Sequence, residues 1–440
     1  LLALTRHRLL RYTIRPHATR PEEASEAKLY LAPFWFLSAL HYGFDIGSKV
    51  VIETDTNAMR QNSNQTLDES YPTVTRRDTG PQKLFRGRVV ERWIADPAAR
   101  AFGIESLRLR AAIHPLEPFT AEHERLGVVL PTYLDVDDAR ARTYALALTI
   151  GVASDGLTKL DCQRSDLIAE TLSLLYYPFW IDTSSPGTPP RVWDAVNGNP
   201  EHTATPQPIA KLAPLTPVFD ELSLVEARCQ RCKEPLPLTG HGIVYPCHAC
   251  DTFWVAEKTG LEPFSASYAK PQVAPTADAP LLWLPFWRVE AIVSYAGQRA
   301  SEVLHAHTLL NISRPPGGLP GAPANDPLSY FVPAYGSMRA PRLDFAARDL
   351  NRLQPLLERG HYESGKFFSC FLGPEDALKL AYVVWLQIIP GALPKRLASL
   401  RVETGAVELW YVPFADQKRE LTNLLTGMRY DRRVFRGVGH

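Results

Sequence analysis

Two Cys-x-x-Cys motifs carry the clearest chemistry in this sequence. Cys229 and Cys232 form the first motif, and Cys247 and Cys250 form the second after 14 intervening residues. A turn of this kind brings two thiolates to one ion, and two such turns complete a tetrahedron with Zn–S distances of about 2.3 Å. The spacing therefore predicts a metal site with four sulfur ligands, and Zn²⁺ is the expected ion. A rubredoxin-like iron centre uses the same ligands and stays open as an alternative.

The ligand set also predicts what the metal does. Four sulfur ligands leave no coordination position for water or substrate, so we expect a structural ion and not a catalytic one. Arg228, Arg231 and Lys233 lie beside the first motif and are candidate contacts for a nucleic acid or a partner. A negatively charged tetrathiolate site attracts such cations in any case, so this basic rim alone does not identify a ligand. We expect His248, inside the second motif, to be a surface imidazole.

The segment between the two motifs favours a small sheet module. Residues 233–246 read as a short strand, a Gly-containing turn and a second strand, which predicts a hairpin with one cysteine turn at each end. Phe253 and Trp254 follow and would supply the aromatic packing of so small a unit. From about residue 225 to about residue 256 the chain resembles a zinc ribbon.

A short aromatic sequence motif built around Pro-Phe, called the Pro-Phe word below, recurs along the chain. Its copies are Pro33-Phe34-Trp35, Pro178-Phe179-Trp180, Pro285-Phe286-Trp287 and Pro413-Phe414. Because proline cannot donate to a β-ladder, each copy is expected at a strand start, a bulge or an edge. The flanking aromatic residues favour sheet cores. Aromatic platforms that stack nucleic-acid bases are the alternative, but no basic residues alternate with these aromatics.

The order of features between the copies predicts an internal duplication. A helix is expected over residues 137–148 after Asp137-Asp138, and a second over residues 377–387 after Pro374-Glu375-Asp376. Each helix stands between two copies of the Pro-Phe word. The second helix is apolar on all sides, so we expect it to be buried.

These patterns predict an α+β protein with two related, sheet-rich halves and a zinc ribbon inserted between them. The expected division of the chain is an N-terminal half, a Pro/Thr-rich linker, the ribbon, a second linker and a C-terminal half. Their ranges are residues 1–182, 183–222, 223–258, 259–280 and 281–440. The 38 prolines favour short strands, turns and extended segments over long helices.

Composition bounds the cellular context. With 48 Lys plus Arg against 47 Asp plus Glu, the chain does not match a protein whose whole surface binds nucleic acid or anionic lipid. Most of its six cysteines cluster in the two motifs, which favours a reducing compartment, and we expect a cytoplasmic protein. The apolar start of the chain is interrupted at Arg6, so we expect no secretory signal, and we expect no membrane insertion.

Function is the least specified property. No GxSxG, HExxH or dinucleotide-binding motif is present, and we expect no catalytic residue. His305 and His307, two apart on an expected strand, would face the same side but have no evident partners for metal binding. The ribbon together with Pro-Phe-Trp strands resembles an uncharacterised group of bacterial zinc-ribbon proteins, a resemblance that implies the architecture and no activity. We expect a non-enzymatic scaffold or adaptor for protein partners. The alternatives are a nucleic-acid-associated factor that uses the ribbon and, third, a hydrolase.

Overall fold

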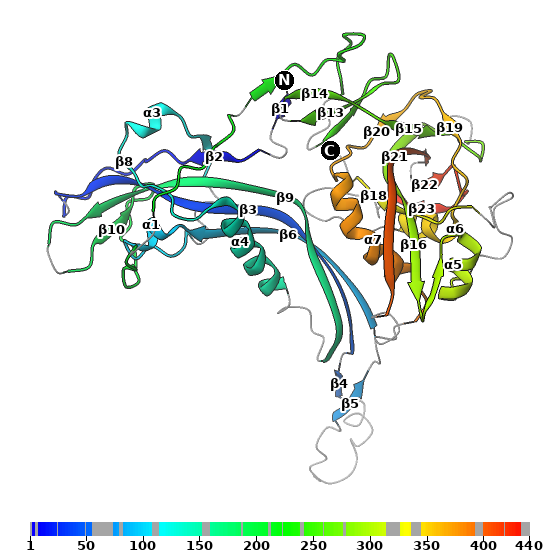
Figure 1. Cartoon of the computed structure of the whole chain (residues 1–440), viewed down its shortest axis with the longest axis horizontal. Helices are drawn as coiled ribbons and strands as arrows, with labels where there is room; N and C mark the ends of the chain where they lie inside the picture. The colour runs from blue at the N-terminus through cyan, green and yellow to red at the C-terminus, as the bar shows by residue number, and fades with distance from the viewer. Residues whose placement is uncertain are drawn as a thin grey trace, which may run out of the picture.

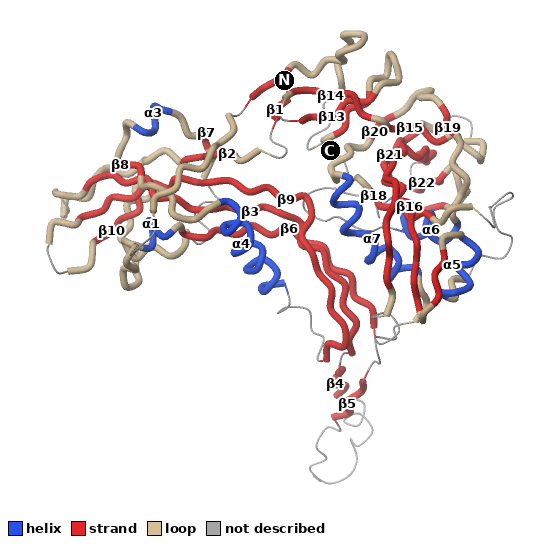
Figure 2. Tube along the Cα trace, viewed as in Figure 1, coloured by secondary structure: helices blue, strands red, loops and turns tan. Residues whose placement is uncertain are grey.

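A computed structural model shows a protein dominated by strands, with few helices (Figure 2). The expected α+β class is therefore confirmed. The described residues are 2–4, 8–23, 25–48, 50–54, 74–78, 82–107, 114–151, 159–185, 188–209, 213–221, 223–237, 242–257, 259–275, 279–313, 326–335, 345–391, 399–417 and 419–432. Two large sheets, one in each half of the chain, account for most of these strands (Figure 1).

The N-terminal sheet has seven strands, and its main path runs β6-β3-β9-β2-β7. Strand β8 pairs with β3, and β10 pairs with β9. The strands are β2 (Leu10–Thr13), β3 (Lys28–Ser48), β6 (Gln82–Ala95), β7 (Glu117–Pro118), β8 (Val128–Val129), β9 (Lys159–Asp182) and β10 (Arg191–Asp194). Strands β4 (Val50–Thr54) and β5 (Val74–Asp78) form a separate antiparallel pair. The long strands β3, β6 and β9 give this sheet its curved, elongated shape in Figure 1.

The C-terminal sheet has nine strands, and its main path runs β17-β16-β21-β15-β19. Strands β18 and β20 pair with β16, whereas β22 pairs with β21 and with β23. The strands are β15 (Ala266–Ala269), β16 (Leu281–Tyr295), β17 (Gln298–Ala300), β18 (Ser329–Pro333), β19 (Arg359–Gly360), β20 (Lys366–Phe367), β21 (Arg401–Gln417), β22 (Glu420–Asn423) and β23 (Arg429–Asp431).

The Pro-Phe words pair with one another in the same register in both sheets. Pro33 of β3 lies opposite Tyr176, two residues before Pro178 of β9. Pro285 of β16 lies opposite Tyr411, two residues before Pro413 of β21. The next strand matches as well, because the parallel strands β2 and β15 reach Tyr176 and Tyr411, respectively. The two sheets therefore share one pairing scheme around these words.

Each proline lies inside a long strand, where that strand changes neighbours, and not at a strand start, a bulge or a free edge. Strand β8 pairs with β3 up to Leu31, and β6 begins its pairing at Phe34, so Pro33 faces the junction. The carbonyl of Pro33 accepts from Asp96 N at 3.1 Å, and the N–H and C=O of one strand residue point to the same side. The N–H that proline lacks would therefore point into this junction, where no ladder bond is lost. The same change of neighbour occurs at Pro178, Pro285 and Pro413.

Most aromatic members of the words are core residues. The rings of Phe34, Phe179, Phe286 and Phe414 are buried, as are Trp35 and Trp287. Trp180 differs, because it is half-buried and its indole N–H donates to Ala18 O at 3.2 Å. In the described residues, these aromatic side chains thus fill the sheets' hydrophobic clusters.

Both expected helices are present. Helix α4 (Val136–Gly151) packs on β3, β6 and β9, and α7 (Pro374–Ile388) packs on β16, β18 and β21. The other described helices are short: α1 (Pro97–Arg100), α3 (Ala121–Glu124), α5 (Val303–Leu310) and α6 (Phe345–Leu353). The strand expected around His305 and His307 is wrong, since both residues belong to α5, where His305 is exposed and His307 buried. At helical spacing two such residues point to different sides.

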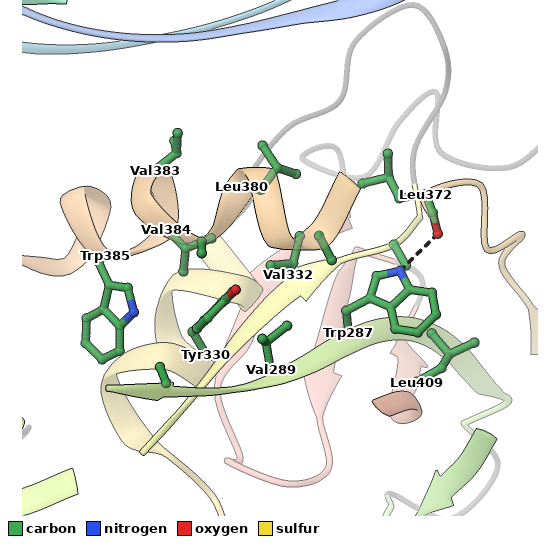
Figure 3. Close-up of a cluster of buried hydrophobic side chains, with 14 of the residues drawn as sticks. Trp287, Val289, Tyr330, Val332, Leu372, Leu380, Val383, Val384, Trp385 and Leu409 are labelled. Carbon is green, nitrogen blue, oxygen red and sulfur yellow. Dashed lines mark hydrogen bonds between the residues drawn. The ribbon is translucent and has the colours of Figure 1, made fainter. Parts of the chain in front are cut away.

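Helix α7 lies between the two sheets. Its side chains share one hydrophobic cluster with Val289 and Tyr330 of the C-terminal sheet and with Leu40 and Ile168 of the N-terminal sheet. Figure 3 shows Leu380 and Val383 pointing away from β16. On this side, Lys379 Nζ donates to Leu167 O of β9 at 2.9 Å. The expected burial of this helix is confirmed, and its second buried face explains why it has so little polar surface.

Candidate metal centre

The cysteine motifs belong to a small, three-stranded antiparallel sheet. Its strands are β12 (Val244–Pro246), β13 (Phe253–Glu257) and β14 (Gly260–Phe264). The second motif forms the turn between β12 and β13. The first motif forms the turn between Arg228 and Pro235, which are joined by an isolated antiparallel β-bridge. Each motif thus lies in its own tight turn. The expected hairpin between the motifs is not found in residues 233–237 and 242–246, and the expected Gly-containing turn lies outside the described residues.

The two cysteine turns have the same backbone construction. Cys229 N donates to Glu234 O at 2.9 Å, and Cys247 N donates to Thr252 O at 2.7 Å. The residue after the last cysteine of each turn is left-handed, with φ of 66° at Lys233 and 54° at Asp251. A left-handed residue reverses the chain tightly enough to bring both sulfurs of a motif to the same side.

The four sulfur atoms converge on one point. The Sγ atoms of Cys229, Cys232, Cys247 and Cys250 all lie within 4.8 Å of one another. Two pairs join the two turns, Cys229 to Cys250 at 3.6 Å and Cys232 to Cys247 at 3.4 Å. Tetrahedral coordination at Zn–S distances of about 2.3 Å requires sulfur separations of about 3.8 Å. The cluster therefore fits a metal ion held by four cysteines.

The protonation of these thiols also favours a cation. Burial raises the pKa of Cys229, but N–H groups of Cys232 and Arg231 and the hydroxyl of Thr252 outweigh it and lower this pKa to about 5. Burial raises the pKa of Cys247 to about 12, and its neighbouring thiols add to the increase. Sulfurs this close cannot all ionise unless a positive charge lies among them. A bound metal would supply that charge, and its binding would release protons.

Strand β13 connects the cysteines to the C-terminal sheet by its alternating faces. Trp254 and Ala256 share a cluster with Cys229 and Cys247 on one face. Phe253 and Val255 belong to the cluster that contains the core of the C-terminal sheet on the other.

Ring contacts continue from this second face. The Phe253 ring lies 5.1 Å from Tyr268 and 5.5 Å from Tyr411 between centroids. Ile243 N donates to Cys370 O at 2.7 Å, which ties the residue before β12 to the loop before α7. The small sheet of β12, β13 and β14 is thus packed directly on the C-terminal sheet. Residues 259–280, expected as a linker, contain β14 and β15.

His248 is exposed, as expected, but it also makes ring contacts. Its imidazole stacks on Phe367 at 4.7 Å and lies 4.6 Å from Tyr362. Burial against these rings lowers the pKa of His248. These contacts place the imidazole where the small sheet packs on the C-terminal sheet, beside the clustered cysteines.

The predicted basic rim lies on exposed backbone next to the first turn. Arg228 forms an ion pair with Glu226 at 2.5 Å, and Lys233 Nζ donates to Gln230 O at 3.0 Å. Arg231 is exposed. Two of the three cations therefore engage neighbours within the ribbon itself.

Sequence reasoning missed one side chain at the sulfurs. The Thr252 hydroxyl lies 3.1 Å from Cys250 Sγ and 3.6 Å from Cys229 Sγ. The available signal was its position two residues after the last cysteine, beyond the left-handed Asp251.

Comparison with known proteins gives no relative. No family model, no curated protein and no solved structure matches the chain. The four clustered cysteines could bind a metal and are compatible with a zinc-ribbon-like site. Within the described part of the chain, no helix has the length and apolar composition needed to cross a membrane.

Proposed function

We propose that the protein is a non-enzymatic scaffold or adaptor whose ribbon is held together by a structural zinc ion. The observation that supports this most strongly is strand β13, which has cysteine ligands packed on one face and the core of the C-terminal sheet on the other. A four-sulfur ligand set has no open position for a reacting molecule. In this position the metal stabilises the ribbon and the surface that the ribbon and the sheet present together. Iron is the alternative ion.

We further propose that the two halves descend from one duplicated unit, with the ribbon inserted between them. The matched pairing of the Pro-Phe words supports this. Two turns after the second word agree as well. Ala195 N donates to Pro178 O at 3.2 Å, and Leu424 N donates to Pro413 O at 3.0 Å. Within each turn a glycine N–H then donates to a carbonyl four residues earlier: Gly198 N to Asp194 O and Gly427 N to Asn423 O, both at 2.8 Å.

Metal analysis of the purified full chain tests the structural part of the proposal. We expect one equivalent of zinc per chain by elemental analysis, lost in Cys229→Ser and Cys247→Ser. Cys370→Ala changes a buried cysteine outside the cluster and should retain the metal. Iron in place of zinc would change the proposed identity of the ion, and a metal-free wild type would contradict the proposed metal centre.

Quantitative affinity purification from native lysate, carried out with and without nuclease treatment, tests the adaptor part. The baits are the tagged wild type, Cys229→Ser, Arg231→Glu on the exposed first turn, and Arg419→Glu between β21 and β22 as a matched charge control. We expect the same protein to be enriched with wild type and with Arg419→Glu, and lost with Cys229→Ser and with Arg231→Glu, which reverses the charge at a candidate partner contact. Its direct binding to the purified wild type would then be measured.

Two outcomes would contradict the adaptor proposal. One is that no protein is enriched over a bait-free control. The other is that binding disappears on nuclease treatment and weakens steeply with salt, which would favour the nucleic-acid alternative.

A further inference from the structure

The two cysteine turns share a backbone but differ in one side chain that reaches the sulfurs. The backbone bond from the first cysteine of each turn ends on Glu234 in one case and on Thr252 in the other. These two residues therefore occupy matching positions. A glutamate carboxylate has no proton to donate when ionised, whereas a threonine hydroxyl donates one hydrogen bond. A hydroxyl donor is thus present at this position in the second turn alone.

The Thr252 hydroxyl is placed between sulfurs from different turns. Its Oγ1 lies 3.1 Å from Cys250 Sγ of its own turn and 3.6 Å from Cys229 Sγ of the other. Its carbonyl accepts from Cys247 N at 2.7 Å, which fixes the backbone that carries the hydroxyl. A metal-bound thiolate has no proton, so in the loaded centre the hydroxyl must be the donor.

We propose that Thr252 is a positioning residue of the metal centre, which donates to the Cys250 thiolate and supports that of Cys229. The inference rests on the proposed metal site. A hydrogen bond to a thiolate withdraws electron density from sulfur and fixes the direction of its lone pairs. Groups in this outer shell commonly change metal affinity by about 10-fold to 100-fold. Thr252 thus strengthens metal binding and makes these sulfurs weaker electron donors.

The test compares three variants of the full chain with wild type. Thr252→Val keeps the shape of the side chain and removes the donor, whereas Thr252→Ser keeps the donor. Thr259→Val removes a hydroxyl that bonds Glu262 in the same small sheet and serves as the matched control. Each protein is titrated with Co²⁺ and Zn²⁺ against a competing chelator, and the cobalt absorption spectrum is recorded. The unfolding midpoint of the metal-free form is measured in parallel.

We expect Thr252→Val to bind both metals about 10-fold to 100-fold more weakly, with Thr252→Ser and Thr259→Val within about threefold of wild type. We also expect the sulfur-to-cobalt charge-transfer bands of Thr252→Val to move to longer wavelength, because its sulfurs are more electron-rich. A merely structural role would not shift these bands.

Three results would overturn the inference. Unchanged affinity and spectrum in Thr252→Val would show that the hydroxyl has no effect on the centre. Weaker binding with an unchanged spectrum, and a metal-free form destabilised to match, would assign Thr252 to folding alone. A wild type that binds neither ion would overturn the proposed metal site itself, a failure that differs from that of the Thr252 inference.

Discussion

The two halves pair their strands in the same register, but the tryptophan at the matching position of each half donates its indole hydrogen bond to a different kind of acceptor. Asp96 N donates to Pro33 O, and Ala334 N donates to Pro285 O at 2.9 Å, so Asp96 and Ala334 occupy matching places. In the C-terminal half, Trp287 Nε1 donates to Leu372 O at 2.9 Å, as Figure 3 shows.

In the N-terminal half, a side chain takes the place of that main-chain acceptor. Trp35 Nε1 points to Asp96 Oδ2 at 3.4 Å, and the same carboxylate accepts from Tyr133 N and Leu134 N. The loop before helix α4 is thus held by one buried carboxylate. The loop before α7 is held by the backbone, with Phe371 N donating to Ala334 O at 2.9 Å. The comparison teaches that the two halves share the pairing of their strands but differ in the polar side chains around it.

The helices of the two halves differ because their outer faces have different neighbours. Counted from Ala139 of α4 and Ala377 of α7, Arg142 takes the place of Leu380, and Ala145 that of Val383. Leu380 and Val383 are buried, whereas Arg142 and Ala145 are exposed. The outer face of α7 packs toward the N-terminal sheet, and its apolar residues follow from that contact.

Removal of the metal should give the largest difference in stability between the two halves. We expect Cys247→Ser, or a chelator on the wild type, to lower the unfolding midpoint of the C-terminal half by at least about 10 °C, as for a loss of about 5 kcal/mol. The ribbon packs on that sheet, so the N-terminal half should change much less. Hydrogen exchange monitored by mass spectrometry distinguishes the halves. Equal loss of protection in both would contradict this asymmetry.

Asp96→Ala should destabilise the N-terminal half by about 3–5 kcal/mol, because it leaves several buried N–H donors without an acceptor. In the other half the tryptophan makes a single hydrogen bond to the main chain, and Trp287→Phe, which removes that bond, should have a smaller effect of about 1–2 kcal/mol. Urea unfolding of both variants gives the free energies. Equal effects would contradict the expectation that the Asp96 carboxylate stabilises its half more than the single Trp287 hydrogen bond stabilises the other.

Acid should affect the N-terminal half through Asp182. Hydrogen bonds from Ser184 and from Arg191 hold the pKa of this carboxyl at about 2. Its ionised form is favoured in the folded protein, so its stabilisation is complete above an unfolded pKa of about 3.9 and is lost as the pH falls through about 2. Gln417 occupies the matching place in β21, four residues after its proline.

Asp182→Asn should therefore flatten the pH dependence of the N-terminal unfolding transition over this range. Thermal unfolding between about pH 2 and pH 5 measures it. An unchanged profile would remove Asp182 from the acid response.

The smallest effect is expected at the contact between the halves. Lys379 also forms an ion pair with Glu170 at 3.2 Å, and its side chain is 36% exposed. We expect Lys379→Met to destabilise the protein by about 1 kcal/mol or less, since exposed pairs contribute little. Arg142→Met, on the exposed face of α4, is the control and should be neutral. A larger loss, with increased exchange in β9, would show that this lysine holds the halves together.

Local patterns in the sequence predicted the cysteine cluster and helix α7. Both depend on residues close in the chain: the two short motifs, and an apolar run after Pro374 and two acids. Thr252 could not be found in this way, because its hydroxyl reaches Cys229 only after two distant turns meet.

Two sequence predictions were wrong, one because the hydrophobic spacing was misread and one because the pairing partner of a strand lies outside the segment considered. The spacing of Val303, Ala306 and Leu310 in α5 fits a helix, but the paired histidines suggested a strand. The hairpin between the motifs was wrong because β12 pairs with β13, beyond the second turn, and not within the segment.

The prolines in the long strands have a consequence for folding errors. A shift of β3 against its neighbours by two residues keeps every side chain on its proper face, so hydrophobic burial alone would tolerate it. Such a shift would move Pro33 out of its junction and set it against a strand that needs an N–H donor. The same holds for Pro178, Pro285 and Pro413, each at a change of neighbour. These four prolines therefore disfavour shifted strand pairings, because a shifted ladder would lack an N–H donor that the observed alignment does not need.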